Sequence, residues 1–170
     1  MDEHGPFSGE EGEFLRALLD EGVEFLVVGL AAAALQGAQA VTQDVDLWFR
    51  DLADPGIQRA LRRVGGIYVP PTGSTPPLLS GRAVAPFDIV LTMHGLRPFE
   101  DEAAGARRML VDGIPLRLLP LDRIIASKKA ARRPKDFAIL PALEAAAHAE
   151  SIKKPPRAAT RRSARPKGRR

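Results

Sequence analysis

The stretch "VTQDVDLWF", residues 41–49, places two aspartates one residue apart inside an otherwise apolar run. Side chains alternate between the two faces of a β-strand, so Asp44 and Asp46 would share one face while the apolar residues between and after them share the other. The pattern therefore predicts a strand with one face in a core and two carboxylates on its other face. Carboxylates held that close repel each other, and burial raises the cost, so the pair needs a compensating partner.

Further elements follow from apolar periodicity, caps and turn residues. Helices are expected over residues 9–20, 30–37, 54–64, 98–110, 121–133 and 134–150, and strands over 23–29, 41–49, 65–70, 86–93 and 114–120. Ser8 and Glu11 have capping-box spacing before the first helix, and Pro141 is expected to kink or break the last one. Four prolines and two glycines predict a loop over residues 70–81. This order predicts an α/β or α+β domain around one sheet.

The size and composition of the chain exclude several classes of protein. A length of 170 residues suits one domain with a core, and the absence of cysteine excludes a disulfide framework, a thiolate nucleophile and a zinc–thiolate site. The acidic N-terminal stretch lacks the layout of a signal peptide, and the longest apolar run, around residues 25–35, is too short for a membrane span. We expect a cytoplasmic protein that does not enter the membrane.

The basic charge of the chain comes from its C-terminal end. The net charge is +4, but residues 151–170 hold nine Lys and Arg residues and no acid, so residues 1–150 carry 16 basic and 21 acidic residues. We expect one domain over residues 1–150 and a disordered basic tail over residues 151–170. Such a tail would contact nucleic acid weakly, although no aromatic residue is interleaved to stack on bases; an extension that only aids solubility explains it equally well.

A third aspartate, Asp88, stands on the predicted strand "PFDIVLTM", on the face opposite its apolar residues. If this strand is a neighbour of residues 41–49, three carboxylates converge. Magnesium prefers oxygen ligands and is typically held by few carboxylates together with substrate phosphates, so it would offset the repulsion. A two-ion site of this kind serves phosphoryl transfer. The alternative is a half-exposed strand face with solvated polar side chains, which Trp48 on the same face favours; we prefer the metal interpretation because Asp is depleted in strands.

Read together, these segments resemble the nucleotidyltransferase superfamily with the polymerase-beta-like fold. "FLVVGLAAAALQGAQAVTQDVDLWF" is similar to that family's apolar strand, glycine step, short helix and Asp-x-Asp strand, and Asp88 matches its third acid. "IIASKKAARRPKDFAIL" is similar to the Lys-x-Ala-Ala-x-Arg-x-Lys-Asp segment of the minimal and toxin-type branches. The positions that match this segment are Lys128, Arg133, Lys135 and Asp136.

The resemblance implies a mixed sheet flanked by helices, with C-terminal helices, and magnesium-dependent transfer of a nucleoside monophosphate from a nucleoside triphosphate to an acceptor. It implies that Asp44, Asp46 and Asp88 are catalytic and ligate two magnesium ions. The backbone at Gly29 and Leu30 would face the phosphates, and Lys128 would reach them as a point charge. The acceptor stays open between RNA, a protein hydroxyl and a small molecule.

Several single residues have simpler interpretations as well. Leu30 stands where the family has a second glycine or a serine, which keeps open a catalytically degenerate protein that binds a nucleotide or a partner. Gly29 would also serve simply to end a strand, and Lys128 to solvate a helix face. Arg133 is expected at a helix surface or as a partner of Asp136. His94, in "TMHGL", has no evident partner and is expected to be structural or exposed.

Overall fold

A computed structural model of the chain describes residues 5–153, and residues 1–4 and 154–170 lie outside the described part. The predicted disordered tail therefore falls almost wholly outside it. The last helix of the described part runs to Lys153, three residues beyond the predicted end of the domain. Within residues 5–153, no helix combines the length and the apolar character that crossing a membrane requires.

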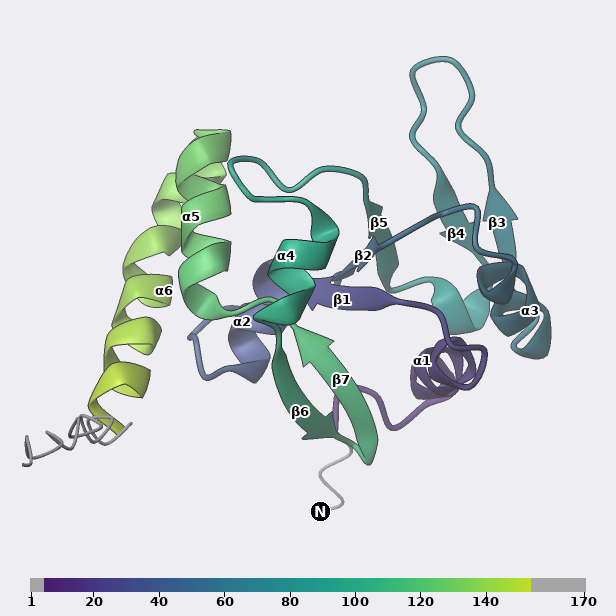
Figure 1. Ribbon diagram of the computed structural model, residues 1–170, viewed down its shortest axis with the longest axis horizontal. Helices are drawn as coiled ribbons and strands as arrows, with labels where there is room; N and C mark the ends of the chain where they lie inside the picture. The colour runs from purple at the N-terminus through teal and green to yellow at the C-terminus, as the bar shows by residue number, and fades with distance from the viewer. Residues whose placement is uncertain (1–4, 154–170) are drawn as a thin grey trace, which may run out of the picture.

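Five strands form a mixed sheet at the centre of the described chain (Figure 1). They are β1 (Phe25–Val28), β2 (Val45–Phe49), β5 (Phe87–Val90), β6 (Arg107–Val111) and β7 (Ile114–Leu118). The order across the sheet is β5-β2-β1-β7-β6. Strand β2 runs antiparallel to β1 and parallel to β5, β7 runs parallel to β1, and β6 is antiparallel to β7. This mixed sheet confirms the predicted fold class.

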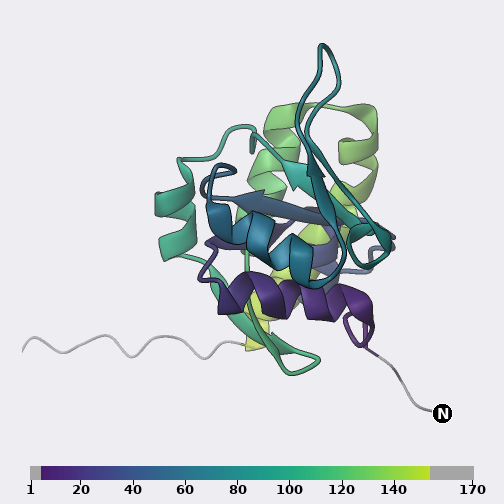
Figure 2. The ribbon, with the colours of Figure 1, turned by 90° about the vertical axis from the view of Figure 1, so that its right-hand side faces the viewer.

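Helices cover the sheet, and a small second sheet projects from it. The helices are α1 (Glu10–Asp20), α2 (Gly29–Leu35), α3 (Pro55–Arg63), α4 (Phe99–Ala104), α5 (Leu121–Ala131) and α6 (Pro134–Lys153). Strands β3 (Ile67–Val69) and β4 (Leu78–Ser80) pair in an antiparallel hairpin. Figures 1 and 2 show α1 and α3 side by side on one side of the molecule and α5 with α6 on the opposite side.

The two faces of β2 contact different layers. On the face opposite Asp46, Phe14 of α1 packs on Phe87 of the neighbouring strand β5, with ring centroids 5.3 Å apart. On the face that carries Asp46, Trp48 meets Phe99 of α4 edge-on, also at 5.3 Å, and is only 8% exposed. This face of β2 is therefore covered at Trp48, which contradicts the alternative of a face solvated along its length.

The predicted helix starts are confirmed in outline and corrected in detail. Asp54 caps α3, because its side chain accepts a hydrogen bond from the Gly56 N–H at 2.7 Å. At α1 the cap residue is Gly9, one position after the predicted Ser8, and Glu11 accepts the Gly9 N–H at 3.1 Å. The capping box predicted between Ser8 and Glu11 is therefore not formed, because the Ser8 N–H donates to the Gly5 carbonyl instead.

Three predicted boundaries are wrong. The helix expected over residues 98–110 ends at Ala104, and the rest is β6, because a tight turn at Asp112 and Gly113 (φ 50° and 75°) pairs β6 with β7. The loop expected over residues 70–81 contains β4. The last helix is not broken at Pro141 but continues through it.

Candidate active site

The parallel register of β2 and β5 brings two of the predicted aspartates together. Asp46 is the register partner of Asp88, so both side chains lie on the same face of neighbouring strands. Asp44 lies immediately before β2 and is exposed, and its backbone N–H donates to the Thr42 hydroxyl at 3.2 Å. Acids from two separate β-segments thus converge, as the predicted site requires.

The environment of Asp46 disfavours its negative charge. Burial raises the pKa of Asp46, and the negative charge of Asp88 is the second cause of the rise. The positive charge of Lys128 lowers this pKa in part, and the negative charge of Asp44 raises it further. Within the described residues, no three His, Cys, Asp or Glu side chains are grouped closely enough to hold a metal ion by themselves. The carboxylates of Asp46 and Asp88 are oxygen ligands of the type that magnesium accepts, and any ion held there would need further ligands from elsewhere.

Gly29, at the start of α2, has a structural reason to be glycine. Its φ is +63°, and a Cβ atom built on it would overlap the Oδ2 atom of Asp46. The bare backbone therefore lets the Asp46 carboxylate lie directly over the end of β1, where Val28 is its register partner. Room for a carboxylate is thus a second reason for the glycine, beside the predicted approach of phosphate.

We expect Gly29→Ala to destabilise the protein more than Gly37→Ala does. Gly37 has φ +95° with nothing near its missing Cβ, so its substitution adds only backbone strain of about 1 kcal/mol. Gly29→Ala adds the same strain and also displaces Asp46. Urea unfolding of the two variants measures the difference; equal losses of unfolding free energy would show that the contact with Asp46 has no energetic weight.

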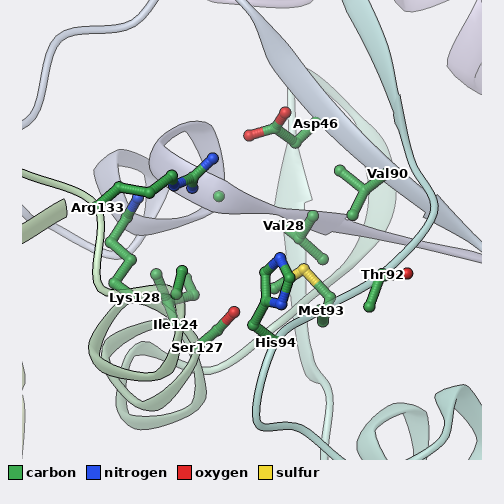
Figure 3. A pocket seen from close by; sticks show the side chains of 12 residues that line it. Val28, Asp46, Val90, Thr92, Met93, His94, Ile124, Ser127, Lys128 and Arg133 are labelled. Carbon is green, nitrogen blue, oxygen red and sulfur yellow. The ribbon is translucent and has the colours of Figure 1, made fainter. Parts of the chain in front are cut away.

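A pocket of about 190 Å³ opens beside Asp46 (Figure 3). Gly29 and Asp46 form one wall, Lys128 of α5 and Arg133 after it form another, and the loop that carries His94 forms a third. Ligand sites usually measure about 300–1,000 Å³, so this pocket would enclose only part of a nucleoside triphosphate.

A buried carboxylate fixes the cationic wall. Asp136 accepts hydrogen bonds from Lys128 Nζ at 2.9 Å and from Arg133 Nε at 2.6 Å, and it is 1% exposed. Burial by itself would raise the pKa of Asp136, but the hydrogen bonds from Arg133 and Lys128 outweigh it and hold the pKa below its ordinary value. The expectation that Arg133 pairs with Asp136 is confirmed.

The predicted residues do not all reach the pocket. Asp46, Gly29 and Lys128 line it, whereas Asp44 and Asp88 are exposed outside its lining, and the side chain of Leu30 packs against the core. The sequence interpretation missed His94, which lines the pocket. The signal was the "MHGL" segment, which has the glycine of a tight turn directly after a strand.

Comparisons with known proteins bear on the fold. No protein family model matches the chain, and no curated protein matches its sequence. The crystal structure of ANT(2″)-Ia in complex with adenylyl-2″-tobramycin is similar, with a TM-score of 0.55, 14% identity, and coverage of 84% of this chain and 90% of that one. The solution structure of the antibiotic-resistance factor ANT(2″)-Ia is also similar, with a TM-score of 0.52, 13% identity, and coverage of 85% of this chain and 90% of that one. The chain therefore has a nucleotidyltransferase-like fold, as the resemblance predicts.

Proposed function

We propose that the protein is a magnesium-dependent nucleotidyltransferase, which moves a nucleoside monophosphate from a nucleoside triphosphate to an acceptor hydroxyl. The observation that carries this proposal is the in-register pair Asp46 and Asp88, with Asp46 facing the fixed cations Lys128 and Arg133 across one pocket. Opposite charges on facing walls suit a triphosphate with its metal ions better than they suit a neutral ligand.

Each wall has a separate task in this reaction. Lys128 and Arg133 bind the triphosphate, while Asp46 and Asp88, with Asp44 beside them, hold the magnesium. Magnesium held by these carboxylates would supply charge neutralisation for the transferred phosphoryl group. The acceptor oxygen attacks the α-phosphorus, pyrophosphate leaves, and Asp88, the more exposed member of the pair, accepts the hydroxyl proton.

Leu30 does not exclude nucleotide from this site. Its side chain packs against the core and is not among the residues that line the pocket. Only its backbone N–H is then offered to a ligand. This placement supports an active enzyme over a degenerate one whose pocket is closed by a bulky side chain.

We propose a small-molecule hydroxyl as the acceptor and ATP as the first donor to test. The similar crystal structure holds adenylyl-2″-tobramycin, a small molecule that carries a transferred adenylyl group. Asp88 lies on β5, the edge strand of the five-stranded sheet, so an acceptor can reach it from outside the pocket.

Calorimetry with ATP, GTP, CTP and UTP, with magnesium and then with EDTA, tests the proposal. We expect magnesium-dependent binding of at least one triphosphate, and α-labelled product from that triphosphate with tobramycin as the acceptor probe. Asp88→Asn should weaken the magnesium-dependent binding and lower transfer by about 10²-fold or more. Asp101→Asn, an exposed carboxylate on α4, should change neither. Binding of no triphosphate in magnesium would refute the proposed function.

A further inference from the structure

The loop between β5 and α4, residues 91–98, is fixed in place by a glycine turn. The Leu96 N–H donates to the Met93 carbonyl at 3.2 Å, which closes a turn with His94 and Gly95 at its centre. Gly95 has φ +67°, the conformation that the third residue of a type II turn requires. A Cβ atom there would lie 2.5 Å from the Ala130 Cβ, so the turn packs directly on α5.

A buried ion pair ties the end of this loop to the same helix. Glu102, 2% exposed on α4, accepts the backbone N–H of Arg97 at 3.1 Å. It also accepts two hydrogen bonds from Arg123 of α5, at 2.6 and 2.8 Å. Chiefly because of the hydrogen bond from Arg123, the pKa of Glu102 is lowered to about 2. Two attachments to α5 make the loop a fixed wall of the pocket, with its side chains already positioned for a ligand.

This wall differs in chemistry from the one opposite. Lys128 and Arg133 supply positive charge on the α5–α6 side, whereas the loop presents Met93 and His94. Figure 3 shows these two side chains together, across the pocket from Asp46. Val28, Val90 and Ile124 contribute apolar surface between the walls, together with the hydroxyl-bearing residues Thr92 and Ser127.

We propose that His94 is a nucleotide-binding residue that stacks on the base of the donor nucleotide. This inference rests on the proposed function. With the triphosphate on the cationic wall, the uncharged wall of the pocket is the surface left for the base. A flat imidazole stacks on a nucleobase, and the Met93 thioether makes favourable contacts with aromatic rings. Gly95 acts as a positioning residue, because it lets the turn that carries His94 lie against α5.

Binding of two probes separates contact with the base from contact with phosphate. We expect His94→Ala to raise the dissociation constant of magnesium ATP about ten-fold. The same variant should leave the affinity for magnesium tripolyphosphate, which has no base, unchanged. His94→Phe, which keeps a ring, should retain at least most of the affinity for ATP. His148→Ala, an exposed histidine on α6, serves as the matched control and should behave as wild type.

A pair of glycine variants tests the positioning of the turn. Gly95→Ala adds both strain and the contact with Ala130, whereas Gly113→Ala, at φ +75° with open space around it, adds strain alone. Both should lower the melting temperature. Only Gly95→Ala should also weaken ATP binding while leaving tripolyphosphate binding intact. An unchanged ATP affinity in Gly95→Ala would overturn the positioning role.

The outcomes distinguish this inference from the proposed function. Equal loss of ATP and tripolyphosphate affinity in His94→Ala would assign the histidine to phosphate and overturn the stacking contact. Loss of ATP affinity in His94→Phe as large as in His94→Ala would overturn it as well, and so would wild-type binding by His94→Ala. If the wild-type protein binds tripolyphosphate but no nucleoside triphosphate, both the proposed function and the stacking contact are refuted. If the wild-type protein binds magnesium ATP and His94→Ala binds it equally well, the proposed function stands and the stacking contact is refuted.

Discussion

Asp46→Asn is expected to abolish nucleotidyl transfer and at the same time to stabilise the protein. Loss of a carboxylate that supports the magnesium ions should lower kcat/KM by about 10³-fold. The unfolding free energy at pH 7 in EDTA should rise by on the order of 1 kcal/mol, since burial and the neighbouring charge of Asp88 oppose ionisation of Asp46 in the folded state. Urea unfolding and a transfer assay on the same preparations measure both effects.

The pH dependence of this gain has a defined sign. The folded-state pKa of Asp46 lies above its ordinary value of 3.8, so the carboxyl disfavours folding only once it ionises. The advantage of Asp46→Asn should therefore shrink as the pH falls through the raised pKa and disappear below 3.8. Asp51→Asn, in the exposed loop after β2, should show no such gain. Magnesium with ATP should stabilise wild type and not Asp46→Asn; a variant less stable than wild type in EDTA would contradict the argument.

Asp136→Asn is expected to lower the unfolding free energy by about 3 kcal/mol, because it leaves the ammonium group of Lys128 largely buried beside an uncharged partner. The pKa of Asp136 is lowered in the folded state, so its contribution is fully present above its ordinary value of 3.8 and is lost as the pH falls through the lowered pKa. The variant should also bind magnesium ATP more weakly, since the cationic wall loses its anchor. Urea unfolding at several pH values and calorimetry measure the two effects.

A second ion pair on the same helices provides the control for Asp136→Asn. Lys129 and Glu144 also join α5 to α6, at 2.7 Å, but both side chains are half exposed. Glu144→Gln should therefore cost less than about 1 kcal/mol and leave nucleotide affinity unchanged. Equal costs for Asp136→Asn and Glu144→Gln would show that burial of Asp136 contributes nothing to stability.

The sequence predicts the elements of this fold wherever local signals agree with the final packing. Asp54 before Pro55 marks the start of α3, and the alternation over residues 41–49 marks β2, although the strand begins only at Val45. The local sequence signals fail where pairing with another strand determines the secondary structure of a segment. The Arg-Arg-Met-Leu segment of β6 suits a helix by propensity, and pairing with β7 overrides that preference. In the same way β4 forms inside a proline-rich segment because β3 pairs with it.

At the candidate site, too, local sequence patterns predict some features, whereas others depend on contacts between residues far apart in the chain. The spacing of Asp44 and Asp46 is visible in the sequence, but the pairing of Asp46 with Asp88 depends on the register of β2 and β5, which no local pattern specifies. Burial of Trp48 depends on Phe99, which lies on a helix far along the chain. The placement of His94 in the pocket depends on contact between a turn and α5, so the sequence alone left it without a role.

Strands β2 and β5 are neighbours in the sheet although residues 50–86 separate them in the chain. That intervening segment leaves the sheet, forms α3 and the β3–β4 hairpin, and returns beside Asp46. Its tip, residues 70–76, is exposed, so we expect loops of other length to be accepted there without a change in the strand pairing that aligns Asp46 and Asp88. The hairpin is therefore a place where loops can be exchanged while the pairing of β2 with β5 is kept.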